Sequence, residues 1–286
     1  MQMTQTPPSL SVIRKHLKIE SVSVVSHCSL LAHPDFDLTM FTHCNLVVLI
    51  FVLILQDQVY TGEIIGGREV VPHSKPYMVL LELHNLGGHN KHCDGFLVNE
   101  DFVLTAAHCH AKSYKVFLGL HDYHNHNGVQ HVSVPETNAF PHKDYNPVSY
   151  SNDIMLLKLS TKAVFNENVK PIDLADRDDG FAPKSCVVPG WGNTGNGKDS
   201  DVLLEVNVTL TENEICAKEN KYCSEGATGP STGDSGGPLV CEDGKAYGVV
   251  SASSNSMLDG LKLYSYIKIS DKRDWIDSVI DHHRKW

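Results

Sequence analysis

The chain has 286 residues, with 24 Lys and Arg against 34 Asp and Glu, so its formal net charge is −10 at neutral pH. An acidic surface of this kind disfavours nucleic acid and anionic membranes as partners. The length from Ile64 onward suits one domain, or two compact subdomains that share a cleft. Six of the eight cysteines follow Ile64, an even number that indicates disulfides if the chain is secreted, and no Cys-x-x-Cys spacing supports the alternative of a zinc site.

The sequence before Ile64 is typical of a targeting segment and not of a folded domain. Residues 1–39 are polar and irregular, so they are either disordered or an upstream extension absent from the natural product, with Met40 as its start. The apolar run Leu46–Leu55 is too short for a helix that spans a bilayer, which needs about 20 residues. It matches the core of a signal peptide over residues 40–61, cut after Thr61, and so predicts secretion or storage in a secretory granule; a signal anchor is the alternative.

Short strand-like runs separated by Gly, Pro and Asn turns follow Ile64, which is typical of an all-β barrel or sandwich. The expected strands are residues 77–83, 96–98, 102–105, 115–118, 154–159, 186–188, 203–210, 238–241, 246–251 and 261–267. A helix is expected at residues 271–284, because Trp275 and Val279, with Ile276 and Ile280, share one face at helical spacing.

The run Gly233–Pro238 reads Gly-Asp-Ser-Gly-Gly-Pro and places a serine between glycines. Glycines permit a tight exposed turn, where backbone N–H groups can approach a substrate carbonyl. Serine is a weak nucleophile unless a base, and a residue that orients the base, lie close by. His108, within Thr105–Cys109, and Asp153, which precedes an apolar run, are the candidates for those roles.

From Ile64 to about Trp286 the chain resembles the chymotrypsin-fold serine proteases, and within them the granzyme and mast-cell-protease branch. The triad of chymotrypsin has the same chain order of His, Asp and Ser, and the stretches that carry the resemblance are residues 64–67, 105–109, 153–157, 190–192 and 233–238. The resemblance implies two six-stranded antiparallel β-barrels, at about 64–170 and 171–270, followed by the helix at 271–284. It also implies a serine endopeptidase without cofactor or metal; an inert homologue that acts as a binding protein is the alternative.

The same resemblance assigns roles to the candidate site. Ser235 is the expected nucleophile, His108 its base, and Asp153 the residue that orients His108. The N–H groups of Gly233 and Ser235 are the expected oxyanion hole.

Activation is expected to depend on the residues that precede the peptidase domain. Gly62-Glu63 resembles an activation dipeptide, which implies removal by a dipeptidyl peptidase. The freed ammonium of Ile64 is then expected to form a buried ion pair with Asp234 and to order the turn of the nucleophile.

Substrate specificity is expected to differ from that of trypsin. By resemblance Gly229 forms the floor of the primary pocket, so the carboxylate that would bind Lys or Arg is absent. Ser251 and Ser253 are expected to line this pocket, although Ala252-Ser253 departs from the usual aromatic residue and glycine. Lys262 is placed to pair with an acidic substrate residue; the alternatives are that it turns to solvent and that the enzyme prefers apolar residues, as chymases do.

The remaining expectations concern disulfides, surface sites and partners. The resemblance implies the disulfide pairs Cys93–Cys109, Cys186–Cys241 and Cys216–Cys223, while Cys28 and Cys44 precede the mature start. Asn207 starts an N-glycosylation sequon. Residues 121–127 with His131 are rich in histidine, and we favour a solvated loop over a metal site. Expected partners are protein or peptide substrates and serpin-type inhibitors, with the chain as a monomer and without a stable membrane anchor.

Overall fold

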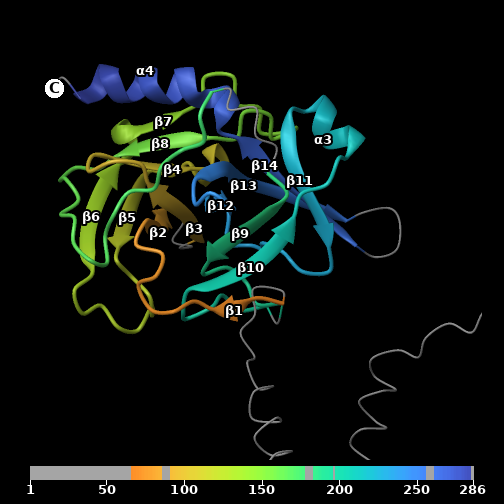
Figure 1. The fold of residues 1–286 in the computed structure, drawn as a ribbon. Helices are drawn as coiled ribbons and strands as arrows, with labels where there is room; N and C mark the ends of the chain where they lie inside the picture. The colour runs from red at the N-terminus through yellow and green to blue at the C-terminus, as the bar shows by residue number, and fades with distance from the viewer. Residues whose placement is uncertain (1–65, 86–90, 178–182, 196, 256–260, 285–286) are drawn as a thin grey trace, which may run out of the picture. The chain divides into compact units, whose positions relative to one another are not determined.

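The computed structural model describes residues 66–85, 91–177, 183–195, 197–255 and 261–284. Two curled antiparallel sheets form most of this part of the chain (Figure 1). The first has the order β6-β5-β2-β3-β4-β8-β7, and its strands are β2 Met78–His84, β3 Lys91–Leu97, β4 Phe102–Thr105, β5 Ser113–Leu118, β6 Gln130–Pro135, β7 Ala139–Pro141 and β8 Met155–Lys158.

The second sheet has the order β1-β10-β9-β12-β13-β14-β11. Its strands are β1 Arg68–Glu69, β9 Ser185–Gly190, β10 Leu204–Thr209, β11 Lys221–Gly226, β12 Pro238–Cys241, β13 Ala246–Asn255 and β14 Lys262–Lys268. The expected all-β fold with a C-terminal helix is therefore confirmed. Each sheet has seven strands where the resemblance implied six, because the short strands β1 and β7 add to an edge of each sheet.

Strand β2 contributes side chains to two apolar clusters, one of which also contains residues of the second half. It pairs with β3 on one side and β5 on the other, and its side chains alternate between two apolar clusters. Val79 and Leu81 pack in the core of the first sheet, whereas Leu80 packs in a cluster with Trp191 and Leu203 from the second half. Since successive side chains of a strand point to opposite faces, a strand covered on both faces reads as the continuous apolar run seen at residues 78–81.

The C-terminal helix α4, Arg273–Arg284, follows the single turn η3, Ser270–Lys272. Ile276 is fully buried in the core of the first sheet, and Trp275, Val279 and Ile280 pack against that core, so the expected apolar face is confirmed. No helix among the described residues is long and apolar enough to cross a membrane.

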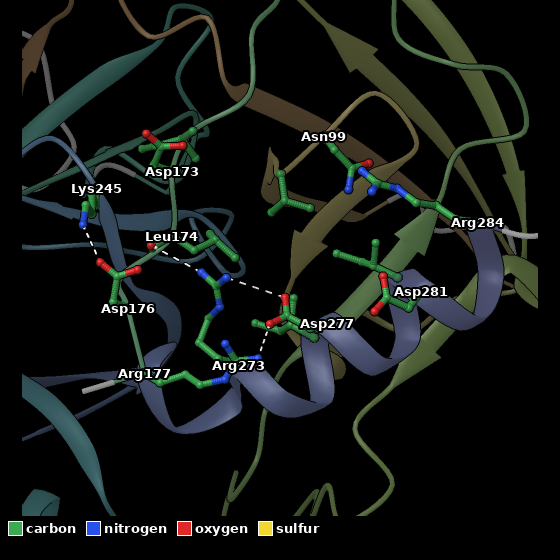
Figure 2. Close-up of a pocket in the computed structure, with 14 residues that line it drawn as sticks. Asn99, Asp173, Leu174, Asp176, Arg177, Lys245, Arg273, Asp277, Asp281 and Arg284 are labelled. Carbon is green, nitrogen blue, oxygen red and sulfur yellow. Dashed lines mark hydrogen bonds and ion pairs between the residues drawn. The ribbon is translucent and has the colours of Figure 1, made fainter. Parts of the chain in front are cut away.

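A polar groove lies between α4 and the connector between the sheets (Figure 2). Arg177 from the connector pairs with Asp274 at 2.6 Å and with Asp277 at 2.5 Å, both on α4. Arg273 donates to the carbonyl oxygen of Leu174 at 3.4 Å. These contacts hold the helix against the segment that joins the two sheets.

Some elements were not expected. Strand β6 lies partly in the histidine-rich segment, so His131 is in a strand and the expected loop ends before it. Helix α3, Glu214–Lys218, is capped by Asn213, whose side chain accepts hydrogen bonds from the N–H groups of Ile215 and Cys216. Five residues are too few to give a helical period in the sequence.

Candidate active site

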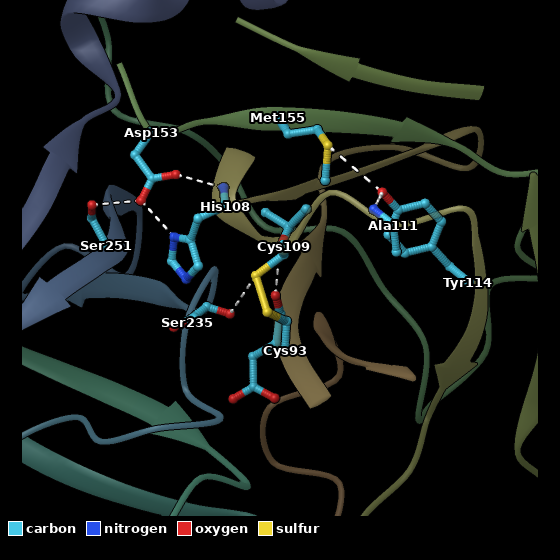
Figure 3. Close-up of a disulfide and its surroundings, with 11 residues drawn as sticks. Cys93, His108, Cys109, Ala111, Tyr114, Asp153, Met155, Ser235 and Ser251 are labelled. Carbon is cyan, nitrogen blue, oxygen red and sulfur yellow. Dashed lines mark hydrogen bonds and ion pairs between the residues drawn. A yellow bond between two sulfur atoms is a disulfide. The ribbon is translucent and has the colours of Figure 1, made fainter. Parts of the chain in front are cut away.

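His108 lies in a single 3-10 turn, η1 Ala107–Cys109, directly after β4. Its backbone N–H donates to Oδ1 of Asp153 at 2.8 Å, and its Nδ1 lies 2.7 Å from Oδ2 of the same residue (Figure 3). Asp153 is fully buried, directly before Ile154 and β8, which pairs with β4. The carboxylate therefore fixes both the backbone and the ring of His108, and it favours a proton on Nδ1, leaving Nε2 as the basic nitrogen.

Ser251 supplies a further hydrogen bond to the same carboxylate. Its Oγ donates to Oδ2 of Asp153 at 2.6 Å, and the residue is buried. We expected Ser251 in the substrate pocket; because its hydroxyl is bound to Asp153, only its backbone is left for a substrate contact. These hydrogen bonds satisfy the buried carboxylate, and no Lys or Arg among the described residues forms an ion pair with it.

Ser235 lies in a turn between the loop at residues 228–234 and β12. Gly233 and Gly236 on either side have φ of 103° and 87°, values that favour glycine. The carbonyl oxygen of Ser235 accepts a hydrogen bond from the Asp94 N–H at 2.8 Å, and the Gly236 N–H donates to the Val250 carbonyl at 2.8 Å. The turn is thus attached to β3 of the first sheet and β13 of the second.

The Cys93–Cys109 disulfide joins β3 to the turn of His108. Sγ of Cys109 lies 3.8 Å from the carbonyl oxygen of Ser235, so the bridge packs between the histidine and serine segments (Figure 3). The other disulfides are Cys186–Cys241, between β9 and β12, and Cys216–Cys223, which attaches α3 to β11. All three are the pairs that the resemblance implied.

Asp234, next to Ser235, is fully buried. Its Oδ1 accepts from the Gly192 N–H and its Oδ2 from the Ser231 N–H, both at 2.7 Å. Burial raises the pKa of Asp234 to about 7, despite these two hydrogen bonds. Its expected partner, Ile64, lies outside the described residues.

The residues expected in the primary pocket come from the loop that follows β11 and from the strands β13 and β14. A Cβ on Gly229 would lie 2.5 Å from the ring of Tyr264, so this buried ring covers the glycine. Lys262 is two residues before Tyr264 on β14, which puts both side chains on the same face of the strand. Ser253, on β13, is exposed, and it lies opposite Tyr264 in the antiparallel pairing of β13 with β14. Among the described residues the Lys262 ammonium has no ion pair.

Sequence reasoning missed two residues near this site. Tyr150 is at the end of a turn-rich segment, with φ of 54°, and its ring meets the His108 ring edge-on at 5.6 Å between centroids. The surrounding run of Asn, Pro and Ser could have indicated a loop beside Asp153. Asp94 is buried beneath the serine turn, and no sequence pattern singles it out.

The histidine-rich segment forms local contacts away from the triad candidates. Nε2 of His121 lies 3.0 Å from Glu69, and Nδ1 of His126 lies 3.4 Å from Nε2 of His131, with the two rings stacked. His124 faces Asp201 at 3.1 Å.

Two curled antiparallel sheets, with a histidine held by a buried aspartate and a serine between glycines, define the class of chymotrypsin-like serine endopeptidases. A family model described as Trypsin matches residues 64–276. The chain belongs to this trypsin family of serine endopeptidases.

The chain is similar to curated granzymes and to a cathepsin. The chain is 40% identical to Granzyme B of Rattus norvegicus over 249 residues, which covers 82% of this chain and 98% of the relative. It is 36% identical to Cathepsin G of Homo sapiens, with 82% and 94% covered. A solved structure described as "Structure of GrC" is 37% identical, with a TM-score of 0.66, and covers 76% of this chain and 99% of the other. The chain is thus a trypsin-like serine protease related to granzymes and cathepsin G.

Proposed function

We propose that this protein hydrolyses peptide bonds through a triad of Ser235, His108 and Asp153. The observation that carries the proposal is the 2.7 Å contact between His108 Nδ1 and the buried Asp153. Asp153 stabilises the imidazolium that forms when His108 takes the proton of Ser235. Oγ of Ser235 attacks the substrate carbonyl, and His108 returns the proton to the amine as the peptide bond breaks, which leaves an acyl-enzyme. Water, activated by His108 in the same way, then hydrolyses the acyl-enzyme and regenerates Ser235.

The N–H groups of Gly233 and Ser235 serve as the oxyanion hole of this reaction. The positive φ of Gly233 supports this role, because it turns the backbone in a way that a side chain would disfavour. Loss of one such donor costs about 3–4 kcal/mol of transition-state stabilisation in related chemistry.

A covalent phosphonate probe for active serines tests the triad. We expect the secreted, processed chain to be labelled at Ser235, and Ser235→Ala or His108→Ala to abolish labelling. Ser265→Ala, at a serine whose Oγ donates to the Ala252 carbonyl nearby, is the matched control and should still be labelled. A folded, processed protein that remains unlabelled would favour the inert binding homologue instead.

The enzyme prefers substrates with an acidic residue before the scissile bond, because the Lys262 ammonium pairs with that side chain. The position of Lys262 on the face of β14 that carries Tyr264, together with the ring of Tyr264 over Gly229, supports this assignment. A cation at the wall of a pocket with a neutral floor would pair with Asp or Glu of the substrate. A chymase-like preference for apolar residues is the alternative if the ammonium turns to solvent. A peptide library varied at that residue separates the two.

The precursor is secreted, loses a signal peptide and Gly62-Glu63, and inserts the new Ile64 ammonium beside Asp234. The burial of Asp234 without a cation among the described residues supports this step. Asn207 is exposed on β10 and available for glycosylation. The active form acts as a monomer on protein substrates and is inhibited by serpins. N-terminal sequencing of secreted material should begin at Ile64.

A further inference from the structure

Asp94, on β3, is a fully buried carboxylate that the proposed triad does not use. Its Oδ2 accepts a hydrogen bond from the Trp191 N–H at 3.3 Å. Its Oδ1 has no hydrogen-bond partner among the described residues. An ionised carboxylate that is buried with so little hydrogen bonding is costly, so the protonation of this side chain needs an explanation.

A second buried carboxylate, that of Asp234, lies beside it. A Cβ on Gly190 would lie within 2.5 Å of both Asp94 Oδ2 and Asp234 Oδ1, so the two oxygens converge on one glycine. Two carboxylates this close and shielded from water repel strongly when both are ionised, so one of them keeps a proton. Burial first, and then repulsion from Asp234, raises the pKa of Asp94 well above its usual range.

The hydrogen bonds decide which residue carries the proton. Asp234 accepts two N–H bonds of 2.7 Å, whereas Asp94 accepts one of 3.3 Å, and N–H donors stabilise the ionised form. Asp199 also faces the pair and repels both carboxylates; His92, the titratable neighbour of Asp94 on β3, lies 3.6 Å from Asp199. The Ile64 ammonium that we propose beside Asp234 stabilises an anion there as well. The anion is therefore on Asp234 and the proton on Asp94.

The backbone of Asp94 connects this pair to the nucleophile. Its N–H donates to the Ser235 carbonyl at 2.8 Å, and its carbonyl accepts from Thr105 Oγ1 at 2.7 Å. We propose that Asp94 is a positioning residue: as a neutral acid it lets Asp234 hold the oxyanion turn, residues 231–236, as the single buried anion. This inference rests on the proposed role of Ser235. Loss of the proton would place a second negative charge beneath the turn that stabilises a developing oxyanion.

The protonation state can be measured without activity, in the full chain carrying Ser235→Ala. Carbon-13 labelling of the aspartate carboxyls allows each to be titrated by NMR. We expect one carboxyl still protonated at pH 7, and its signal should be lost in Asp94→Asn. If all aspartates are ionised at pH 7, the proposal is wrong, whether or not the Asn variant folds.

The second measurement is the melting temperature of the same two proteins between pH 5 and pH 9. A folded-state pKa above the unfolded value near 4 means that stability falls as pH rises through that window. Asp94→Asn escapes the share of this loss that comes from Asp94, whereas the share from Asp234, whose pKa is raised to about 7, is common to both proteins. The melting temperature of Asp94→Asn relative to the parent should therefore rise by roughly 5 °C across the range. A difference that does not change with pH would indicate a merely structural role and overturn the proposal.

A third measurement connects the pair to catalysis in the chain with Ser235 intact. The rate of probe labelling is measured at pH 7 and at pH 9. The factor by which this rate falls should be at least threefold larger in the parent than in Asp94→Asn. Equal losses would contradict an effect on the oxyanion turn. Absence of labelling in both proteins would contradict the triad alone, because the titration and melting results stand independently of it.

Discussion

The hydroxyl of Ser251 donates a 2.6 Å hydrogen bond to Oδ2 of Asp153, the same oxygen that faces Nδ1 of His108. A residue of the second sheet thereby supports a carboxylate of the first, at the base of the proposed triad. The hydrogen bonds of Asp153 therefore depend on both sheets being assembled.

Removal of this hydroxyl by Ser251→Ala should lower kcat/KM by about tenfold or more. A hydrogen bond to a charged group contributes about 1.5–3 kcal/mol, and Asp153 would stabilise the His108 cation less well without it. Ser265→Ala, on the adjacent strand, is the control and should change kcat/KM by less than about twofold. Equal effects of the two substitutions would show that Ser251 acts through packing only.

Asp153→Asn should reduce kcat by about 10⁴-fold with the fold retained, because an amide can donate to the ring and stabilise the wrong tautomer of His108. Steady-state kinetics on a peptide substrate and a melting curve measure the two effects separately. Asp144→Asn, at an exposed aspartate nearby, should leave kcat unchanged. Near-normal activity of Asp153→Asn would remove Asp153 from the triad.

Lys262→Met should abolish cleavage after Asp and Glu while leaving the labelling of Ser235 intact, since it removes only the cation proposed for the pocket wall. A peptide library compared before and after the substitution gives the result. Lys268→Met, farther along β14, is the matched control and should retain the acidic preference. Persistent cleavage after Glu in Lys262→Met would retire this role of the lysine.

Glu205→Gln should destabilise the protein at neutral pH by about 1 kcal/mol. Burial raises the pKa of Glu205, but hydrogen bonds from Arg68 and Lys75 outweigh burial and hold the pKa below its usual value. The stabilisation is thus present above the unfolded pKa and disappears as pH falls through the folded one.

Denaturant unfolding at pH 7 and pH 3 measures this loss for Glu205. The unfolding free energies of the parent and of Glu205→Gln should differ at pH 7 and become equal at pH 3. Glu167→Gln, at an exposed glutamate, should behave like the parent at both pH values. A destabilisation that is equally large at pH 3 would show that the charge of Glu205 is not its cause.

Removal of the Cys93–Cys109 disulfide by a double Ala substitution should cost about 3 kcal/mol of unfolding free energy, from the chain entropy of its loop. The Cys216–Cys223 bridge closes a shorter loop, 7 residues against 16, and should cost slightly less. Only the first removal should also slow labelling of Ser235, because this bridge packs against the serine turn. Equal slowing by both would argue against that specific contact.

Local patterns in the sequence predicted the all-β class, the helix face with Trp275 and Val279, and, through motif resemblance, the candidates His108, Asp153 and Ser235. These features are local, because strand alternation, helical spacing and short motifs involve only residues that are close in the sequence. The strand β6 was missed because its two buried residues, Val132 and Val134, lie in a stretch dominated by polar residues.

The tertiary structure decided which groups meet across large separations in the chain. Ser251 reaches Asp153 across 98 positions of the chain, and the carboxylates of Asp94 and Asp234 converge on Gly190 from two different segments. Hydrogen bonding, burial and charge repulsion depend on distance in space, and that distance is set by how the two sheets pack. The sequence by itself therefore determined the class of enzyme and its candidate residues, whereas packing decided the hydrogen-bond partners and the burial of each one.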